Sequence, residues 1–473
     1  MSPADRLDVA DVMRGLRFVA ALPRLFRRPL NPTDARAVLA RRLEQREADF
    51  VALMRRVVFG NLKSPYRRLL GLAGCEQGDL AQLVASEGVE SSLERLARHG
   101  VFLTVDEAKG RAPVVRGSST FELDPADLAN PGAAAHLLYR TSGSRGAGTL
   151  VSVDVAHFRD RAVNTALVLA ARGGWSWRHA LWGVPGGAAI TVLLEHAALG
   201  VPPVAWFSQV DPRSPNLDPR YAWSTRVLRW AGRVLGTVLP SPVTAPLARP
   251  APVVGWIREC LGAGQAPHLI TFPSSAVELC RAAREAGVEL AGLELSIGGE
   301  PITSVRLAAI RAAGAHALPR YGSMESGRIG DGCLAPKAPD DIHVFHDLHA
   351  VVQPGAGDGQ RTVPRTLLFS SLRDSAPVVL LNVSLGDQAV LARRRCRCPL
   401  EELGWTTHLH TIRSDEKLTA AGMTLLDGDA ISALEEVLPA RFGGVATDYQ
   451  LLEEEDAAGR PRLVLVVSPR VGA

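Results

Sequence analysis

The sequence lacks the features that assign a chain to a membrane or a secretory pathway. Its 473 residues contain no run of about 20 apolar residues, which a membrane-spanning helix requires. The N-terminal stretch MSPADRLDVADVMRG carries charges throughout and has no apolar centre of the kind found in secretory signals. We therefore expect a cytoplasmic protein without a membrane span.

The chain also has little net charge and very little lysine. It contains 53 basic and 49 acidic residues, which leaves a net charge of +4. Nucleic-acid-binding proteins gather basic residues on one face, and this balance predicts no nucleic-acid partner. The only lysines are Lys63, Lys109, Lys337 and Lys417. A catalytic lysine would have to be one of these.

Cysteine is scarce, and its six occurrences differ in context. A cytoplasmic chain rarely uses disulfide bonds, so we expect none. Cys75, Cys260 and Cys280 lie in apolar or helical stretches, which is typical of small buried hydrophobic residues. The other three cysteines lie in loops and are treated below.

The pattern between about residue 150 and residue 330 alternates strands with helices. HALWGVP, PVAWF, HLITFP and LELSIGG are short apolar runs, while SAVELCRAAREAGV and TSVRLAAIRAAGA have helical spacing. This alternation predicts an α/β fold with mixed, largely parallel sheets and flanking helices. Beyond HTIRSD a short α+β segment follows. We expect a large N-terminal domain of residues 1–412 and a small mobile C-terminal domain of residues 413–473.

Two helices are expected near the N-terminus. The basic, apolar stretch MRGLRFVAALPRLFRRPL would lie on a membrane surface or pack on the body of the protein, and its interruption by Pro23 favours packing. A second helix is expected over residues 33–60, with Thr33 or Asp34 as its N-cap.

The stretch RTSGSRGAGT, residues 140–149, holds three glycines and four hydroxyl side chains between two apolar runs. A plain turn needs fewer glycines, whereas a loop around an anion needs close approach and many hydrogen-bond donors. Gly143 and Gly148 have the spacing of a Walker phosphate-binding loop, but Thr149 stands where that loop has lysine. The pattern thus favours a phosphate-binding loop of another kind, and a surface hairpin is the alternative.

Three later motifs follow this loop in a fixed order: SIGGEPIT at residues 296–303, LPRYGSMESG at residues 318–327, and LGD ending at Asp387. Together with the loop they resemble the adenylate-forming superfamily of acyl- and aryl-CoA synthetases. The phenylacetate–coenzyme A ligase branch is the most similar, because its loop also ends in threonine. NLKSPYRRLL and HLITFPSS resemble that branch as well. The resemblance extends from about residue 40 to the C-terminus.

The resemblance implies ATP-dependent activation of an aryl or fatty carboxylate as an acyl-adenylate, with transfer to a thiol such as coenzyme A. It places Thr149 and Glu325 in catalysis, with Glu325 on Mg²⁺. It assigns ATP or AMP to Ser142, Gly143, Ser144, Gly146, Gly299, Glu300, Pro301, Tyr321, Gly322, Ser323, Met324, Asp387 and Arg413, with Tyr321 on the adenine and Asp387 and Arg413 on the ribose.

The carboxylate itself is expected in an apolar pocket. We assign Trp182, Phe272, Ser274 and Gly298 to it. Residues 181–190 and 268–277 contain no acidic side chain, so the ammonium group of an amino acid would lack a partner. Two alternatives stay open: transfer of the acyl group to a carrier or partner protein, as in acyl-protein synthetases, or a catalytically impaired relative that binds nucleotide and acts as a regulatory or scaffold subunit.

The sequence departs from the family pattern at two points. Met324 replaces a threonine whose hydroxyl contacts the α-phosphate, so one hydrogen-bond donor is lost. The adenylating lysine of the family lies near its C-terminus, and no lysine follows Lys417 here. We therefore expect an incomplete C-terminal domain and weak adenylation by the chain alone.

The loop cysteines indicate a metal site. Cys396 and Cys398 form a C-x-C pair, and Cys333 is followed ten residues later by His343. These four residues supply the number of ligands that a closed structural zinc site needs. Metal sites of this kind occur in the phenylacetate–coenzyme A ligase branch, which favours zinc over three free thiols. His346 and His349 are rivals to His343.

Overall fold

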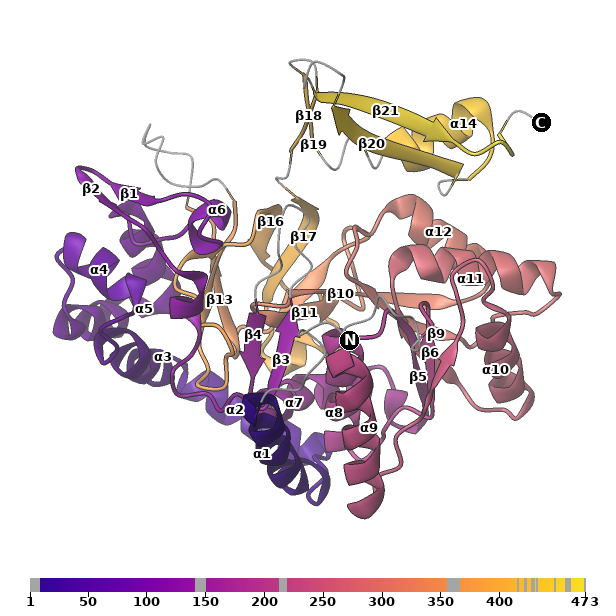
Figure 1. Cartoon of the computed structure of the whole chain (residues 1–473), viewed down its shortest axis with the longest axis horizontal. Helices are drawn as coiled ribbons and strands as arrows, with labels where there is room; N and C mark the ends of the chain where they lie inside the picture. The colour runs from indigo at the N-terminus through magenta and orange to yellow at the C-terminus, as the bar shows by residue number, and fades with distance from the viewer. Residues whose placement is uncertain are drawn as a thin grey trace.

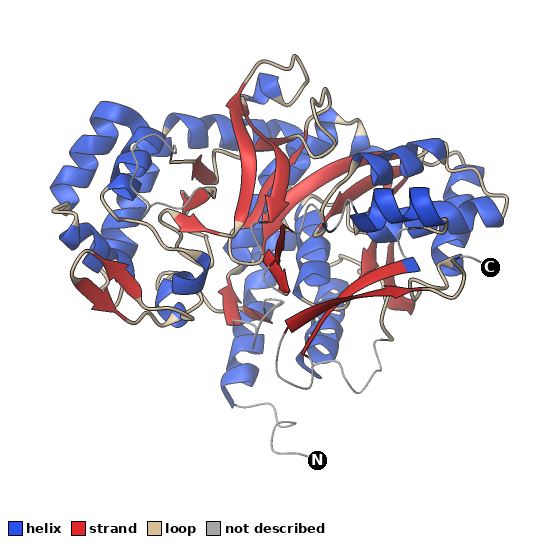
Figure 2. Cartoon of the chain, turned by 90° about the horizontal axis from the view of Figure 1, so that it is seen from above, coloured by secondary structure: helices blue, strands red, loops and turns tan. Residues whose placement is uncertain are grey.

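The computed structural model describes residues 9–140, 150–211, 219–354, 366–414, 417–420, 423–426, 430, 433–445, 448–455 and 461–471. One large sheet runs through the molecule with helices on both of its faces, and smaller sheets lie around it (Figures 1 and 2). The α-helices are α1 (Val9–Phe26), α2 (Pro32–Glu44), α3 (Arg46–Met54), α4 (Pro65–Leu72), α5 (Gln77–Arg98), α6 (Val105–Ala108), α7 (Val155–Ala171), α8 (Gly187–Ala198), α9 (Pro219–Val234), α10 (Ala251–Gly262), α11 (Pro273–Glu285), α12 (Ser304–Ala312) and α14 (Leu438–Phe442).

The strands fall into one large sheet and five small ones within the described residues. They are β1 (Val114–Arg116), β2 (Ser119–Phe121), β3 (Leu137–Arg140), β4 (Leu150–Val153), β5 (Arg178–Gly183), β6 (Ala205–Ser208), β7 (Pro242–Thr244), β8 (Pro267–Thr271), β9 (Glu294–Gly298), β10 (His316–Ser323), β11 (Gly327–Gly332), β12 (Ile342–Val344), β13 (His349–Val352), β14 (Leu368–Ser371), β15 (Val383–Ser384), β16 (Asp387–Arg393), β17 (Thr407–Ser414), β18 (Lys417–Ala420), β19 (Met423–Leu426), β20 (Tyr449–Glu455) and β21 (Pro461–Val467).

The large sheet has ten strands in the order β16-β17-β12-β11-β10-β9-β8-β5-β6-β7. From β7 to β10 all neighbours are parallel, whereas from β10 to β16 they are antiparallel. The parallel half corresponds to the segment in which strands and helices alternate along the chain. The predicted α/β fold with a mixed sheet is therefore confirmed.

Side chains of the parallel strands alternate between two cores. Ala180, Trp182 and Leu269 belong to the core that includes α10, α11 and α12. Leu181 and Trp206 belong to the core on the opposite face, which includes α7 and α8. Because helices cover both faces, these strands read as continuous apolar runs rather than as alternating ones.

The N-terminal helices pack on this second core. Phe18 and Leu22 of α1 are buried there, and α1 continues through Pro23, which does not end it as expected. The predicted helix 33–60 is divided at Gln45 into α2 and α3, and a π-helical turn, Arg55–Phe59, follows. The N-cap of α2 is Asn31, and not Thr33 or Asp34; the Asn31 side chain accepts a hydrogen bond from the backbone N–H of Asp34. None of the described helices is long and apolar enough to cross a membrane.

The C-terminal segment forms two hairpins, β18–β19 and β20–β21, and lies above α12 (Figure 1). The hairpin expected from TDYQLLEEE and RLVLVVSP is thus confirmed as β20–β21. Between the hairpins, the helical turn Ala433–Val437 contacts the large sheet domain through Glu435. The domain boundary at residue 412 stays a prediction.

Candidate functional site

The predicted site residues lie where the parallel strands end. The carboxyl ends of β8, β9 and β10 meet at one edge of the sheet, because these strands are parallel neighbours. Phe272–Ser274 follow β8, Gly299–Pro301 follow β9, and Tyr321–Glu325 span the end of β10 and the turn after it. Open α/β sheets bind their ligands at this edge.

Two adjacent glycines shape the end of β9. A side chain at Gly298 would place its Cβ 2.5 Å from the carbonyl oxygen of Arg320, and Gly299 has a positive φ of +83°. A Cβ on Gly299 would also lie 3.1 Å from the ring of Phe272. The chain can therefore turn sharply here only with glycine, and this turn directs Glu300 toward α11.

Glu300 is held by the segment after β8. Its carboxylate accepts hydrogen bonds from the backbone N–H of Ser274 at 2.9 Å and from the Ser274 hydroxyl at 2.8 Å. Phe272, Ser274 and Gly298, three of the residues expected in the acyl pocket, thus lie around one turn at the sheet edge. Trp182 does not join them.

Trp182 is a buried core residue, and its assignment to the apolar pocket stays a prediction. Its side chain has no solvent exposure, and its indole N–H donates to the carbonyl oxygen of Ala245 at 2.7 Å. The reason is strand alternation, which points Trp182 into the core beneath α10, α11 and α12.

Tyr321, near the end of β10, contacts Asp387, the first residue of β16. The Tyr321 hydroxyl donates to Asp387 Oδ2 at 2.6 Å, although the two residues are 66 positions apart. Burial and the Asp387 carboxylate raise the pKa of Tyr321 well above its usual value, so the phenol keeps its proton. Arg413 pairs with Gln388 in the β16–β17 register and donates to Asp340 at 3.2 Å. The two expected ribose contacts therefore lie on adjacent strands.

The turn after β10 presents a carboxylate. The Ser323 hydroxyl accepts from the backbone N–H of Ser326 at 3.0 Å and thereby closes the turn. The side chain of Met324 packs against a hydrophobic core cluster. Glu325 is partly buried and makes no hydrogen bond or ion pair with any residue that the structure describes. Gly322 next to this turn allows close approach of the Gly327 carbonyl, which a Cβ would meet at 2.3 Å.

The glycine-rich loop itself, with Ser142, Gly143, Ser144, Gly146 and Thr149, lies outside the described residues. Its flanking strands β3 and β4 form an antiparallel hairpin. The ring of Tyr139 lies against Gly187 at the N-terminus of α8, where a Cβ would be 2.6 Å away. Since α8 begins shortly after β5 ends, this hairpin approaches the same edge of the sheet.

A buried charged network beneath the turn was not foreseen. Glu195 of α8 pairs with Arg161 and Arg328, and Arg328 also pairs with Asp331 at 3.3 Å. Burial alone would raise the pKa of Glu195, but Arg161 and Arg328 lower it to about 2. The signal in the sequence was a single carboxylate within the apolar run ITVLLEHAAL, where an unpaired charge would be costly.

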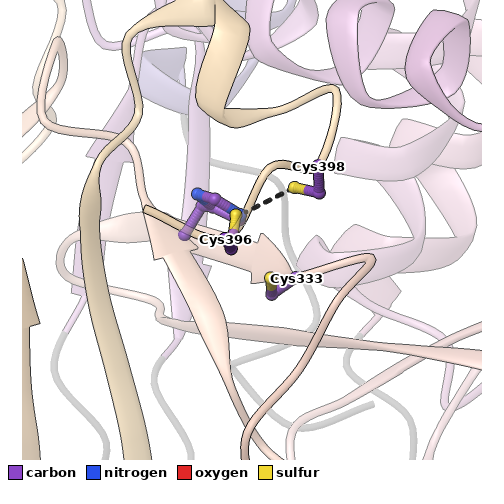
Figure 3. Close-up of side chains that lie close together, drawn as sticks. Cys333, Cys396 and Cys398 are labelled. Atoms are coloured by element: carbon purple, nitrogen blue, oxygen red, sulfur yellow. Dashed lines mark hydrogen bonds between the residues drawn. The ribbon is translucent and has the colours of Figure 1, made fainter. Parts of the chain in front are cut away.

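The loop cysteines and His343 form a second site, away from the sheet edge. We call Cys333, His343, Cys396 and Cys398 the Cys/His cluster. Their ligand atoms lie within 4.8 Å of one another, and the three cysteine side chains face one another (Figure 3). His343 Nε2 is 3.2 Å from Cys398 Sγ and 3.6 Å from Cys396 Sγ. A tetrahedral zinc ion separates such atoms by roughly 3.3–3.8 Å. The donors therefore fit zinc in number, kind and spacing.

The surroundings of the Cys/His cluster orient its donors. His343 Nδ1 donates to the carbonyl oxygen of Trp405 at 2.6 Å, which leaves the Nε2 lone pair for a metal. The Glu401 carboxylate accepts the backbone N–H groups of Cys396 and Arg397 at 2.6 and 2.5 Å and folds the C-x-C loop. Hydrogen bonds, first from Cys333 and then from His343, lower the pKa of Cys398 below its usual value.

His346 and His349 are not part of the Cys/His cluster. They line a separate cavity of about 290 Å³ together with Glu90 and Arg393. His343 lies in β12, whereas His346 follows that strand and His349 begins β13, and of these three only His343 is grouped with the cysteines. The structure brings His343 together with the three cysteines, and the prediction that these four residues bind a metal stays a prediction.

No family model and no curated protein matches the sequence. Solved structures do resemble the fold. A 2-hydroxyisobutyryl-CoA ligase in its postadenylation state, in complex with R3-HIB-AMP, has a TM-score of 0.53 at 15% identity, covering 99% of this chain and 84% of that chain. The same ligase with 2-HIB-AMP and CoA has a TM-score of 0.49 at 16% identity, with 99% and 83% covered. Wild-type E. coli MenE with a bound analogue of OSB-AMS has a TM-score of 0.34 at 13% identity, with 75% and 62% covered.

The chain has the fold of a CoA ligase. This rests on the first of these similarities, in which nearly the whole chain is superimposed. Identity is too low for the comparison to transfer an activity, so function has to be argued from the site itself.

Proposed function

We propose that this protein is an ATP-dependent, carboxylate-activating enzyme of the adenylate-forming superfamily, most similar to its phenylacetate–coenzyme A ligase branch. The observation that carries the proposal is the Tyr321–Asp387 contact at 2.6 Å, on the same sheet edge as the Gly299–Glu300 turn and Glu325. Sequence motifs that are far apart thus converge at the edge where α/β sheets bind ligands.

The reaction proceeds in two steps. A carboxylate oxygen attacks the α-phosphorus of ATP, an acyl–phosphate bond forms, and the bond to pyrophosphate breaks. A thiol then attacks the acyl carbon, a thioester forms, the thiol loses its proton, and AMP leaves. In this chain Asp387 and Arg413 hold the ribose, and the turn at Gly299–Pro301 lines the adenine. Glu325 would hold Mg²⁺, which would supply positive charge to the phosphates.

Zinc belongs to the proposal as a structural ion. The Cys/His cluster offers three sulfur atoms and one imidazole nitrogen, which is a donor set that zinc prefers in closed sites. Bound there, zinc would tie the C-x-C loop after β16 to β12 and to Cys333, just after β11. It would thereby fix the antiparallel half of the large sheet.

We infer that the acyl substrate is an aryl or fatty carboxylate, and the acceptor coenzyme A. Phe272 offers an aromatic surface beside Gly299, where its ring is only 3.1 Å from an added Cβ. Glu300, which follows Gly299 in the same turn, is already engaged by Ser274 and Arg306. Residues 181–190 and 268–277 contain no acidic side chain that would pair with the ammonium group of an amino acid.

A second candidate function follows from Met324. Its side chain packs against the hydrophobic core, so the turn offers no hydroxyl at this position for the α-phosphate. A chain that binds nucleotide but adenylates poorly would act as a regulatory subunit, or would pass its acyl group on only with a partner protein.

The test is nucleotide titration combined with exchange of pyrophosphate into ATP. We expect saturable binding of AMP and ATP, and exchange that depends on an aryl or fatty acid. Asp387→Ala should weaken AMP binding about tenfold or more, since a charge-assisted hydrogen bond contributes about 1.5–3 kcal/mol. Asp106→Ala, an exposed carboxylate on α6, is the control and should bind normally.

Three outcomes separate the candidates. Exchange with aryl or fatty acids supports the enzyme, and binding without exchange under any condition supports the impaired relative. Failure of both nucleotides to bind at millimolar concentration rules out both functions.

A further inference from the structure

Two helices, α1 and α9, form an exposed surface that the sheet-edge site does not use. We propose that this surface binds the face of an anionic lipid bilayer. Docking there would not depend on the adenylation chemistry, because none of its residues belongs to the proposed site. We call the six exposed side chains that form it the α1–α9 face: Leu16, Arg17, Arg226, Trp230, Arg233 and Val234.

The helices α1 and α9 lie side by side (Figure 1). A Cβ on Gly15 of α1 would lie 2.2 Å from the ring of Trp223 in α9. Phe18 of α1 and Leu228 of α9 are buried in the same hydrophobic core. Because both helices pack on one core, their opposite sides look away from it together.

These outward sides carry the α1–α9 face. Leu16 lies two positions before Phe18, and Trp230 lies two positions after Leu228, which is about 200° around the helix in each case. Both side chains therefore point away from the core. The other α9 residues of the face are three or four positions from Trp230, so they share its side of the helix.

The apolar side chains of this face are exposed to solvent. Leu16 is 60%, Trp230 61% and Val234 67% exposed, and Val238, just after α9, is 71% exposed. Exposed apolar side chains that gather in one place mark an interaction surface. Tryptophan in particular is enriched where proteins meet the headgroup region of a membrane.

The charge of the same two segments is positive throughout. Residues 12–33 contain five arginines and no acidic residue, and residues 219–258 contain six arginines and no acidic residue. Since the whole chain has a net charge of only +4, positive charge is concentrated here. Arg17, Arg226 and Arg233 are exposed and make no ion pair with any residue that the structure describes. A negatively charged surface is the partner that this charge favours.

A lipid surface fits the face better than a second copy of the chain or a nucleic acid. A symmetric dimer through this face would oppose its arginines to their own copies, because such an interface is self-complementary. A nucleic acid would meet the arginines but leave Leu16, Trp230 and Val234 in water. Anionic headgroups with an acyl layer beneath them complement both kinds of side chain.

The experiment is co-sedimentation of the full-length protein with lipid vesicles in the absence of nucleotide. One preparation is phosphatidylcholine alone, and in the other about one third of the lipid is anionic phosphatidylglycerol. We expect binding to the anionic vesicles only. Raising the salt from about 0.05 M to about 0.5 M should weaken this binding about tenfold or more, because salt screens exposed charges.

Variants of the face should weaken binding to anionic vesicles. Trp230→Ala should weaken it about tenfold, since a large apolar side chain no longer leaves water. Arg226→Glu combined with Arg233→Glu should weaken it about 25-fold or more, because each arginine near an anionic surface contributes about fivefold. Leu16→Ser should also weaken binding if α1 and α9 act as one face.

Matched controls lie elsewhere on the surface. Phe442→Ala removes another exposed aromatic side chain. Arg284→Glu combined with Arg311→Glu makes the same change of net charge on α11 and α12. Both controls should bind like the unaltered protein, and thermal unfolding should show that each variant is folded. Trp230→Phe is a milder change that should weaken binding less than Trp230→Ala, and it replaces that variant if the alanine variant does not fold.

Four outcomes would overturn the proposal. The first is absence of binding to anionic vesicles, and the second is equal binding to both kinds of vesicle. The third is equal weakening by the two double variants, which would attribute binding to net charge and not to the α1–α9 face. The fourth is a dimer in solution that Trp230→Ala separates into monomers, which would make a second copy the occupant. None of these results bears on nucleotide binding, so the proposed function is tested separately.

Discussion

Two buried groups of side chains in this protein look alike by distance. The Cys/His cluster and a histidine triad, made of His179, His196 and His268, each bring their ligand atoms within 4.8 Å of one another. Only the Cys/His cluster contains sulfur, and its cysteines lie in loops after β11 and β16, with His343 in β12. The triad comes from strands β5 and β8 of the large sheet and from helix α8.

Two members of the triad, His179 and His268, are hydrogen-bonded to each other, whereas His196 bonds elsewhere. His179 Nδ1 and His268 Nδ1 are 2.8 Å apart, so one of the two carries the proton that they share. His268 Nε2 continues to the Ser296 hydroxyl at 2.9 Å, and Arg172 donates to the same hydroxyl at 2.9 Å. His196 Nδ1 bonds to the Val192 carbonyl within its own helix.

The charge of the donors separates the two groups. Cysteine sulfur becomes a thiolate on metal binding, whereas burial lowers the pKa of His179 to about 2 and that of His196 to about 4, which keeps them neutral. Arg172 places a positive charge beside the triad, whereas the three thiols of the Cys/His cluster can become thiolates that offset the charge of a metal ion. Three neutral imidazoles hold zinc in some proteins, so the charge around the donors, and not their distance alone, leads us to favour the Cys/His cluster as the metal site.

Removal of the thiolates should have the largest effect. We expect Cys396→Ser combined with Cys398→Ser to lose about one zinc per chain and on the order of 5 kcal/mol of unfolding free energy, less than the 10–16 kcal/mol of isolated zinc fingers because this chain has its own core. Elemental analysis and denaturant unfolding measure the two quantities. Cys75→Ser, outside the cluster, is the control. Equal stability and no metal in the unaltered protein would identify ordinary thiols.

The next largest effect is expected at low pH, where the histidine triad should lower the unfolding free energy. Its histidines are neutral in the folded state and titrate near pH 6.5 when unfolded, so the unfolded state binds more protons below that pH. Stability should be flat above about pH 6.5 and fall below it by up to about 1.4 kcal/mol per pH unit for each histidine. The charges that face the triad, Arg172, Glu195 and Arg320, stay ionised in this range.

His196→Leu isolates this contribution from that of the Cys/His cluster. Urea unfolding between about pH 7 and about pH 5 should show a slope lower by up to about 1.4 kcal/mol per pH unit than in the unaltered protein. An unchanged slope would show that His196 gains its proton without cost in the folded state, and that burial does not hold it neutral.

The Cys/His cluster could be predicted from the sequence, whereas the histidine triad could not. Cys396 and Cys398 are two positions apart, and His343 follows Cys333 by ten, so local spacing brings them to notice. His179 and His268 are 89 positions apart and meet only because β5 and β8 are paired in register. No local pattern encodes such a pairing, because sheet order is set by the packing of the whole domain.

The same reason explains which parts of the site could be foreseen. The strand ends at Gly298 and Ser323 carry glycine and hydroxyl patterns that mark a turn, so the sheet edge was predictable. The ion pairs of Glu195 and Arg306 join elements more than 30 positions apart, and their partners follow from the fold alone. The burial of Trp182 could not be foreseen, because its strand is apolar on both faces and the sequence therefore hides the direction of each side chain.

The smallest expected effect comes from a matched pair of substitutions at neutral pH, His196→Leu and His343→Leu. His196 Nε2 is buried and has no hydrogen-bond partner among the described residues, so leucine removes an unsatisfied polar atom. The stability gained by removing this unsatisfied atom offsets the imperfect packing of leucine, so the change in unfolding free energy should stay within about 1 kcal/mol.

His343→Leu removes a ligand from the Cys/His cluster. It should lower the unfolding free energy several times more, with loss of zinc. Thermal and urea unfolding of the two variants, with zinc content, make the comparison. If His196→Leu destabilises as much as His343→Leu, or also lowers the metal content, then the triad binds a cation after all and the charge argument that separates the two groups is wrong.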